Sequence, residues 1–135
     1  MKRKLKPKLA LADNAMDVRR LLRPKPFKVP RAVRITPKEV GGVPGEWVEA
    51  ASSDLTLLYL HGGGYVACSV VTHRSITAGF AQLGFRVFAP EYRMAPEHLF
   101  SAAVEDAVAV YRGLLDQCVA GGMRVMIADI EAPAI

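Results

Sequence analysis

The stretch Leu55-Thr56-Leu57-Leu58-Tyr59-Leu60-His61-Gly62-Gly63-Gly64-Tyr65 joins a dense apolar run directly to three consecutive glycines. Residues 55–60 are too few for a typical helix, and an apolar run without alternation is typical of a strand covered on both faces of a sheet. Glycines at the carboxyl end of such a strand expose backbone N–H groups that can bind an anion. Considered alone, however, a glycine run is more often a plain turn that ends a strand.

Two further apolar runs, residues 85–89 and 123–128, have the same length and character and predict two more buried strands. Apolar residues at helical spacing predict a helix between the first two strands, with Thr72 placed to cap its start and Gly84 placed to end it. A fuller apolar stripe predicts a second helix that begins after Ser101 and ends before the next pair of glycines.

Upstream, the apolar positions near residues 33–35 and 47–48 flank the turn-rich segment 40–45, which predicts a hairpin of two antiparallel strands. A short apolar stripe over residues 11–22 predicts a helix, which the following prolines end. The order hairpin, strand, helix, strand, helix, strand predicts an α/β fold whose parallel strands are wound with helices.

The amino-acid composition limits the kinds of protein that this chain can be. The chain has 135 residues, of which 51% are hydrophobic, and we expect one soluble globular domain. No run approaches the roughly 18 apolar residues of a membrane span, and the amino terminus does not resemble a signal peptide, so we expect a cytoplasmic protein. Cys68 and Cys118 are too few for a disulfide scaffold or a structural zinc site, and we expect both thiols to be reduced.

The formal net charge of +5 is unevenly distributed, because most of the basic side chains lie in residues 1–40. A basic arm ahead of an acidic body can attract nucleic acid or anionic lipid. A solvated amino-terminal arm is the better interpretation, since Phe27 is the only aromatic residue in the arm that could stack on a base. We therefore expect no specific nucleic-acid partner.

Five segments in unbroken order resemble one family. The chain looks like the hormone-sensitive-lipase family of α/β-hydrolase carboxylesterases over about residues 30–128, in segments 43–48, 58–65, 72–74, 90–98 and 102–107. The resemblance implies the amino-terminal half of an α/β-hydrolase fold. In that half, residues 1–30 would form a basic arm with a short cap-like helix, and residues 31–135 a partial core.

The resemblance also implies a site. In this family an H-G-G-G-type loop supplies oxyanion-hole donors, so the N–H groups of Gly63 and Gly64 would face the carbonyl oxygen of a bound ester, and Gly62 would provide the tight turn. His61 and Tyr65 would support the loop, with His61 structural rather than a general base. No cofactor and no metal are implied.

Arg93 and Glu97 bracket Pro96 just after the fourth predicted strand, where the family has a loop beside the site. We interpret both residues as scaffold that holds this loop by charge-assisted hydrogen bonds.

The catalytic triad of the family is not found in this sequence. Acyl transfer in the fold needs a serine within G-x-S-x-G after the fifth strand, followed by Asp or Glu and then His, whereas residues 129–135 read Asp-Ile-Glu-Ala-Pro-Ala-Ile. We therefore expect a truncated or frame-shifted, inactive form of an ester hydrolase that acts on small-molecule esters only when completed by the missing half.

The alternative is a non-catalytic remnant or interaction module whose basic arm binds anionic partners. In either case the fifth strand would lie at an open sheet edge, so we expect self-association through it.

Overall fold

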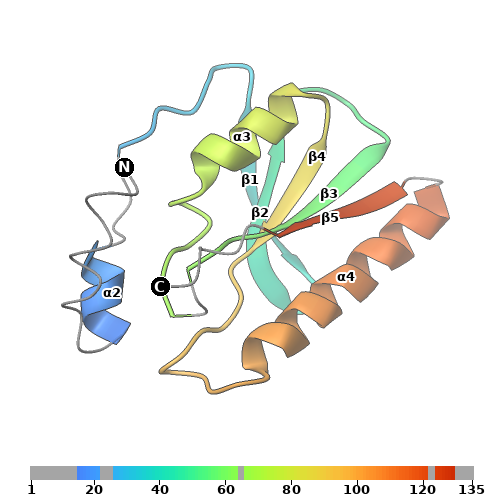
Figure 1. The fold of residues 1–135 in the computed structure, drawn as a ribbon. Coiled ribbons are helices and arrows are strands. Elements are labelled where there is room, and N and C mark those ends of the chain that lie inside the picture. Colours follow the sequence, from blue (N-terminus) through green and yellow to red (C-terminus); the bar gives the residue numbers. More distant parts are fainter. Residues whose placement is uncertain (1–14, 22–25, 64–65, 122–123, 130–135) are drawn as a thin grey trace.

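The computed structural model describes residues 15–21, 26–63, 66–121 and 124–129 (Figure 1). In chain order the elements are α2 (Ala15–Leu21), β1 (Arg34–Val40), β2 (Val43–Glu49), β3 (Leu55–Leu60), α3 (Arg74–Gln82), β4 (Arg86–Pro90), α4 (Ala102–Gly121) and β5 (Arg124–Asp129). The expected succession of hairpin, strands and helices is confirmed. The first four residues and the last residue of the helix expected over 11–22 lie outside the described residues.

The five strands form one sheet in the order β1-β2-β4-β3-β5. Strand β2 is antiparallel to both β1 and β4, while β3 is parallel to its two neighbours, β4 and β5. The expected hairpin is β1–β2, and its turn consists of Gly41 and Gly42, both with positive φ. Two consecutive residues with φ above zero are typical of the tight turns that match the twist of paired strands.

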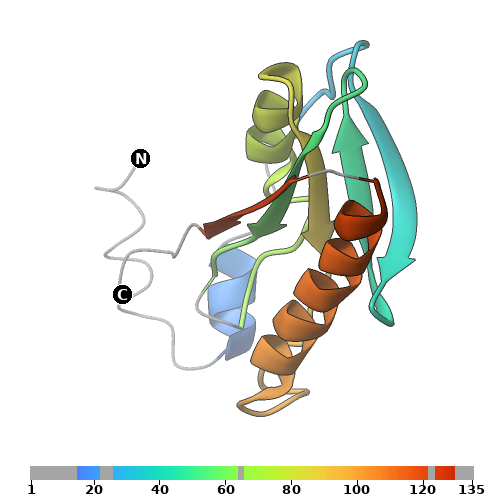
Figure 2. The same cartoon turned by 90° about the vertical axis from the view of Figure 1, so that its right-hand side faces the viewer.

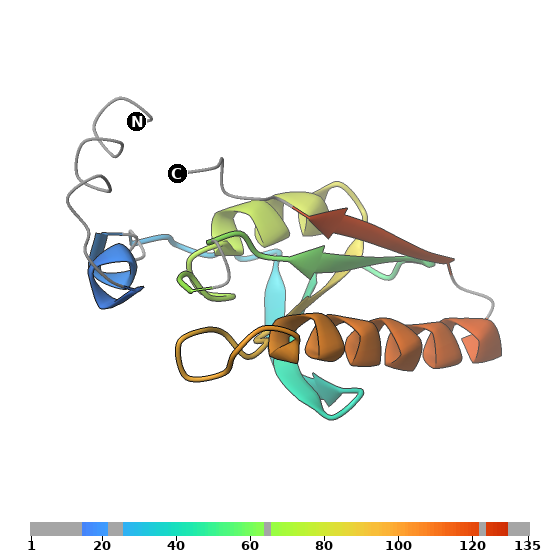
Figure 3. The same ribbon diagram turned by 60° about the horizontal axis from the view of Figure 1, so that its bottom comes forward.

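Helices α3 and α4 cover opposite faces of the sheet, and Figure 3 shows them above and below it. Because successive side chains of a strand point to opposite faces, β3 buries Leu57 and Tyr59 against α3 and Leu58 against α4. The expectation that residues 55–60 form a strand covered on both faces is thus confirmed for the middle of that strand.

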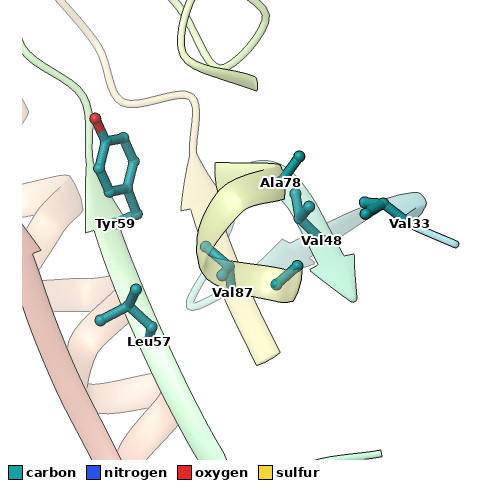
Figure 4. Close-up of a cluster of buried hydrophobic side chains, with 7 residues drawn as sticks. Val33, Val48, Leu57, Tyr59, Ala78 and Val87 are labelled. Carbon is teal, nitrogen blue, oxygen red and sulfur yellow. The ribbon is translucent and has the colours of Figure 1, made fainter. Parts of the chain in front are cut away.

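The core on the α3 face is shown in Figure 4. It is built from side chains of β2, β3, β4 and α3 and from one residue just before β1, namely Val33, Val48, Leu57, Tyr59, Ala78, Ala81 and Val87. On the α4 face the core is bulkier: Trp47 and Phe88 meet edge to face with ring centroids 5.1 Å apart, beside the fully buried Leu114. Such aromatic pairs add to the stabilisation that burial of their surface provides.

Only one of the two predicted ends of α3 is confirmed. Gly84 follows the helix with φ 99°, and its N–H donates to Ala81 O, as expected of a left-handed helix end. The prediction that Thr72 caps the start of this helix was wrong: His73 occupies the N-cap position, without a side-chain hydrogen bond. The Thr72 hydroxyl instead donates to Ser69 O and accepts from Ser69 N, because the preceding turn offers it these closer backbone partners.

Within the part of the chain that the structure describes, β5 is an edge strand and pairs with β3 alone. In the same residues, no helix has both the length and the apolar character that crossing a membrane requires.

Candidate active site

The site lies where β3 and β4 end. Because β3 and β4 are parallel neighbours, their carboxyl ends meet at one edge of the sheet. His61, Gly62 and Gly63 follow β3 there, and Glu91 and Tyr92 follow β4. Helix α2 lies beyond this same edge, past the arrowhead of β3 in Figures 2 and 3.

Gly63 makes the closest backbone approach of the site. It has φ 130°, and a Cβ atom built on it would lie 2.1 Å from Ala67 O. Its carbonyl accepts from Val66 N at 3.3 Å and from Ala67 N at 3.1 Å, so Val66 and Ala67 fold back onto Gly63, an arrangement that we call the glycine turn. No side chain fits at this position, for steric and for conformational reasons. Gly64 and Tyr65, the other two residues expected in or beside the oxyanion loop, lie outside the described residues.

His61 is 3% exposed and lies under the glycine loop. Its Nδ1 is 2.9 Å from Gly62 O, and because a carbonyl can only accept, Nδ1 carries the proton of this bond. The ring stacks on Tyr92 with centroids 4.4 Å apart, and the Tyr92 hydroxyl donates to His61 O. Both the backbone and the side chain of His61 are therefore engaged in holding the loop.

Two titratable groups face His61 from other elements. Glu91 Oε1 is 3.7 Å from His61 Nε2, and the ring of His73 lies 5.6 Å from the His61 ring. Burial lowers the pKa of His73 below its ordinary value, and the proximity of His61 lowers it further. His73 is consequently neutral at pH 7, and its Nδ1 lies 2.8 Å from the Thr72 hydroxyl.

Arg93 anchors the loop after β4 to α4. Its guanidinium donates to both carboxylate oxygens of Asp106 at 2.8–3.1 Å, and its backbone N–H donates to Asp106 Oδ2 at 2.9 Å. Burial by itself would raise the pKa of Asp106, but the hydrogen bonds from Arg93 outweigh it, and the pKa lies below its ordinary value. Asp106 is therefore the partner that keeps Arg93 in place.

Glu97 lies in the turn 94–98, which His98 N closes by donating to Met94 O at 2.9 Å. Its carboxylate is bound by Arg19 of α2: Nη2 donates to Oε2 at 2.6 Å, and Nη1 donates to Oε1. These hydrogen bonds lower the pKa of Glu97 to about 2. Arg93 and Glu97 thus do not pair with each other, and each connects its part of the loop to a different helix.

Sequence reasoning did not single out Arg19, Tyr92 or Asp106 for the site. Tyr92 could have been found, because it follows β4 at the edge where His61 follows β3. Asp106 lies 13 positions from Arg93 and Arg19 lies 78 from Glu97. No sequence spacing signals contacts of that separation, which depend on how the helices dock.

Comparison with known proteins identifies the family and the fold. The profile of the alpha/beta hydrolase fold family matches residues 57–129. An acetyl-hydrolase of Streptomyces hygroscopicus is 47% identical over 97 residues, which are 70% of this chain and 32% of that protein. An ethyl acetate hydrolase of Pseudomonas putida is 41% identical over 76 residues, which are 56% of this chain and 24% of that protein.

Among solved structures, an esterase from the bacterial hormone-sensitive lipase family superposes with a TM-score of 0.75 at 36% identity. The match covers 93% of this chain and 44% of that structure, so the chain spans less than half of it, and about a third or less of the two curated relatives. The chain thus belongs to the α/β-hydrolase fold family and is similar to its hormone-sensitive-lipase-like carboxylesterases.

Proposed function

We propose that this chain supplies the oxyanion-hole half of a serine hydrolase of carboxylic esters. The observation that carries the proposal is Gly63 at the carboxyl end of β3, whose backbone approaches Ala67 so closely that only glycine fits. A loop of this kind presents N–H groups where the oxygen of an ester carbonyl would lie, and His61 with Tyr92 keeps the loop in place. The names of the two curated relatives support a small acyl group such as acetyl.

In this proposal the N–H groups of Gly63 and Gly64 donate to the oxygen that becomes negatively charged in the tetrahedral intermediate, and Gly62 allows the turn between β3 and the donors. Donors that are already oriented toward the developing charge stabilise the transition state more than the ground state. The nucleophile must be a serine activated by a histidine, and the 135-residue sequence has no G-x-S-x-G motif. Hydrolysis therefore requires further residues beyond those of this chain.

The first prediction concerns turnover. The 135-residue chain should not hydrolyse a chromogenic acetate ester above background and should not react with a serine-directed phosphonate, because none of its serines has the required elbow. A chimaera that joins residues 1–129 to the remaining carboxyl-terminal part of the Streptomyces acetyl-hydrolase should hydrolyse the ester. Phosphonylation of a serine in the chain by itself, detected by intact-mass spectrometry, or a folded but inert chimaera would contradict the proposal.

A second prediction concerns self-association, which we propose to occur through β5. As an edge strand, β5 presents N–H and C=O groups along its free side, and such an edge can pair with another chain. The 135-residue chain should therefore show a mass that rises with concentration in light scattering, and Val125→Lys or Ile127→Lys should shift it toward monomer with unchanged helical content. A monomer at all concentrations would contradict this.

A further inference from the structure

Arg19 connects three separate parts of the molecule. It lies on α2, with its side chain 26% exposed, and its guanidinium contacts two turns that come from distant positions in the sequence. Nε donates to Val66 O at 2.6 Å in the glycine turn, and Nη2 donates to Ala95 O at 2.9 Å in the turn 94–98. The two terminal nitrogens also bind both oxygens of Glu97.

The contact with Val66 bears directly on the glycine loop. Val66 N donates to Gly63 O, so the carbonyl that Arg19 binds belongs to the same short turn as the glycine. A displacement of Val66 would therefore displace Gly63. A planar guanidinium can serve several acceptors in fixed directions, whereas a lysine ammonium acts as a point charge.

We propose that Arg19 is a positioning residue that holds α2 against the glycine turn and thereby fixes the orientation of the Gly63 N–H. The catalytic part of this inference rests on the proposed function, whereas the structural part does not. The Arg19–Glu97 ion pair by itself is half exposed and would contribute little. What makes the arrangement effective is that one guanidinium binds a carboxylate and two backbone carbonyls at once.

The electrostatics of Glu97 support the same contact. The hydrogen bond from Arg19 is the largest cause of the lowering of its pKa, and His98 adds a smaller coulombic contribution. Because the folded-state pKa is below the ordinary value of 4.5, the pairing stabilises the fold above that pH and is lost as the pH falls through about 2. A direct titration of the Glu97 carboxyl therefore reports whether Arg19 is bound to it.

The test uses the 135-residue chain and Arg19→Ala, with Arg20→Ala as the matched control. Arg20 lies on the same helix and carries the same charge, but its side chain is 68% exposed and its Nη1 lies 3.8 Å from Asp17 Oδ1. Amide hydrogen exchange at Val66, Ala67 and residues 15–21 should rise by about tenfold or more in Arg19→Ala and should stay at the parent rate in Arg20→Ala. Arg19→Lys should not restore the parent rate, because lysine cannot replace the planar fork.

Carbon-detected NMR titration should place the pKa of Glu97 near 2 in the parent chain and near its ordinary value in Arg19→Ala. In the active chimaera the same variant should lower kcat by about tenfold with little change in KM, as expected when an interaction of the transition state is weakened. Equal exchange in the two arginine variants, or an unchanged Glu97 pKa, would overturn the inference. An inert parent chimaera would instead count against the proposed function and leave the exchange test valid.

Discussion

Replacement of Gly63 by alanine should lower kcat/KM of the ester-hydrolysing chimaera by about a hundredfold to a thousandfold, the effect of removing one oxyanion donor. The added methyl group would lie 2.1 Å from Ala67 O, and φ 130° is a conformation that alanine rarely adopts. The turn must therefore open, which carries the Gly63 N–H away from the developing charge. Most of the loss should appear in kcat, because the interaction strengthens in the transition state.

Gly84→Ala is the matched control for this variant. Gly84 also has a positive φ of 99°, but a Cβ atom there meets nothing within 4 Å. The Gly84→Ala variant should be less stable because of backbone strain, but it should retain the parent kcat. Circular dichroism would measure the folded fraction of each variant, and titration with a phosphonate would measure the fraction of enzyme whose active-site serine is reactive. A Gly63→Ala enzyme with the parent kcat would exclude Gly63 as a donor.

Arg74→Met should lower the free energy of unfolding by about 3 kcal/mol, because it leaves a buried carboxylate without its partner. Glu46 of β2 is 4% exposed, and both of its oxygens accept from Arg74 at the start of α3, at 2.9 and 3.1 Å. The hydrogen bond to Glu46 also raises the pKa of Arg74. Without the guanidinium, the Glu46 carboxylate is still removed from water on folding, but it no longer gains the hydrogen bonds that compensate for this loss.

Urea unfolding of the 135-residue chain would measure this effect. Ser75→Ala, an exposed neighbour on the same helix, should change the stability by less than about 0.5 kcal/mol. The double variant Glu46→Leu/Arg74→Met should regain much of the loss, since an apolar pair of similar volume often replaces a buried ion pair without cost. An Arg74→Met chain as stable as the parent would show that water reaches Glu46.

The strands, the start of α4 after Ser101 and the end of α3 could be predicted because their causes are local, whereas α4 was expected to end before Gly121 and includes it. The apolar runs of β3 and β4 show that both faces are buried, and Gly84 with its positive φ ends α3 as expected. Thr72 shows where local reasoning fails. A hydroxyl before a helix has several backbone partners within reach, and the conformation of the preceding turn, which brings it to Ser69, decides among them.

The glycine loop could also be located from the sequence, because three glycines directly follow an apolar strand. Its interpretation as an oxyanion loop came from the family resemblance and not from the glycines alone. The residues that hold the loop could be found only in part. His61 adjoins the glycines, whereas Tyr92 reaches it because β3 and β4 are neighbours in the sheet, although a helix separates them in the chain.

Burial of β3 on both faces and the place of the glycines after it could be predicted from the order of apolar residues and glycines along one short segment. The family, in contrast, was recognised from the resemblance of five segments in unbroken order. The pairing of Glu97 with Arg19, of Arg93 with Asp106 and of Glu46 with Arg74 depends instead on the tertiary fold. A charged side chain can pair with any opposite charge within reach, and the docking of α2, α3 and α4 on the sheet determines which charges those are.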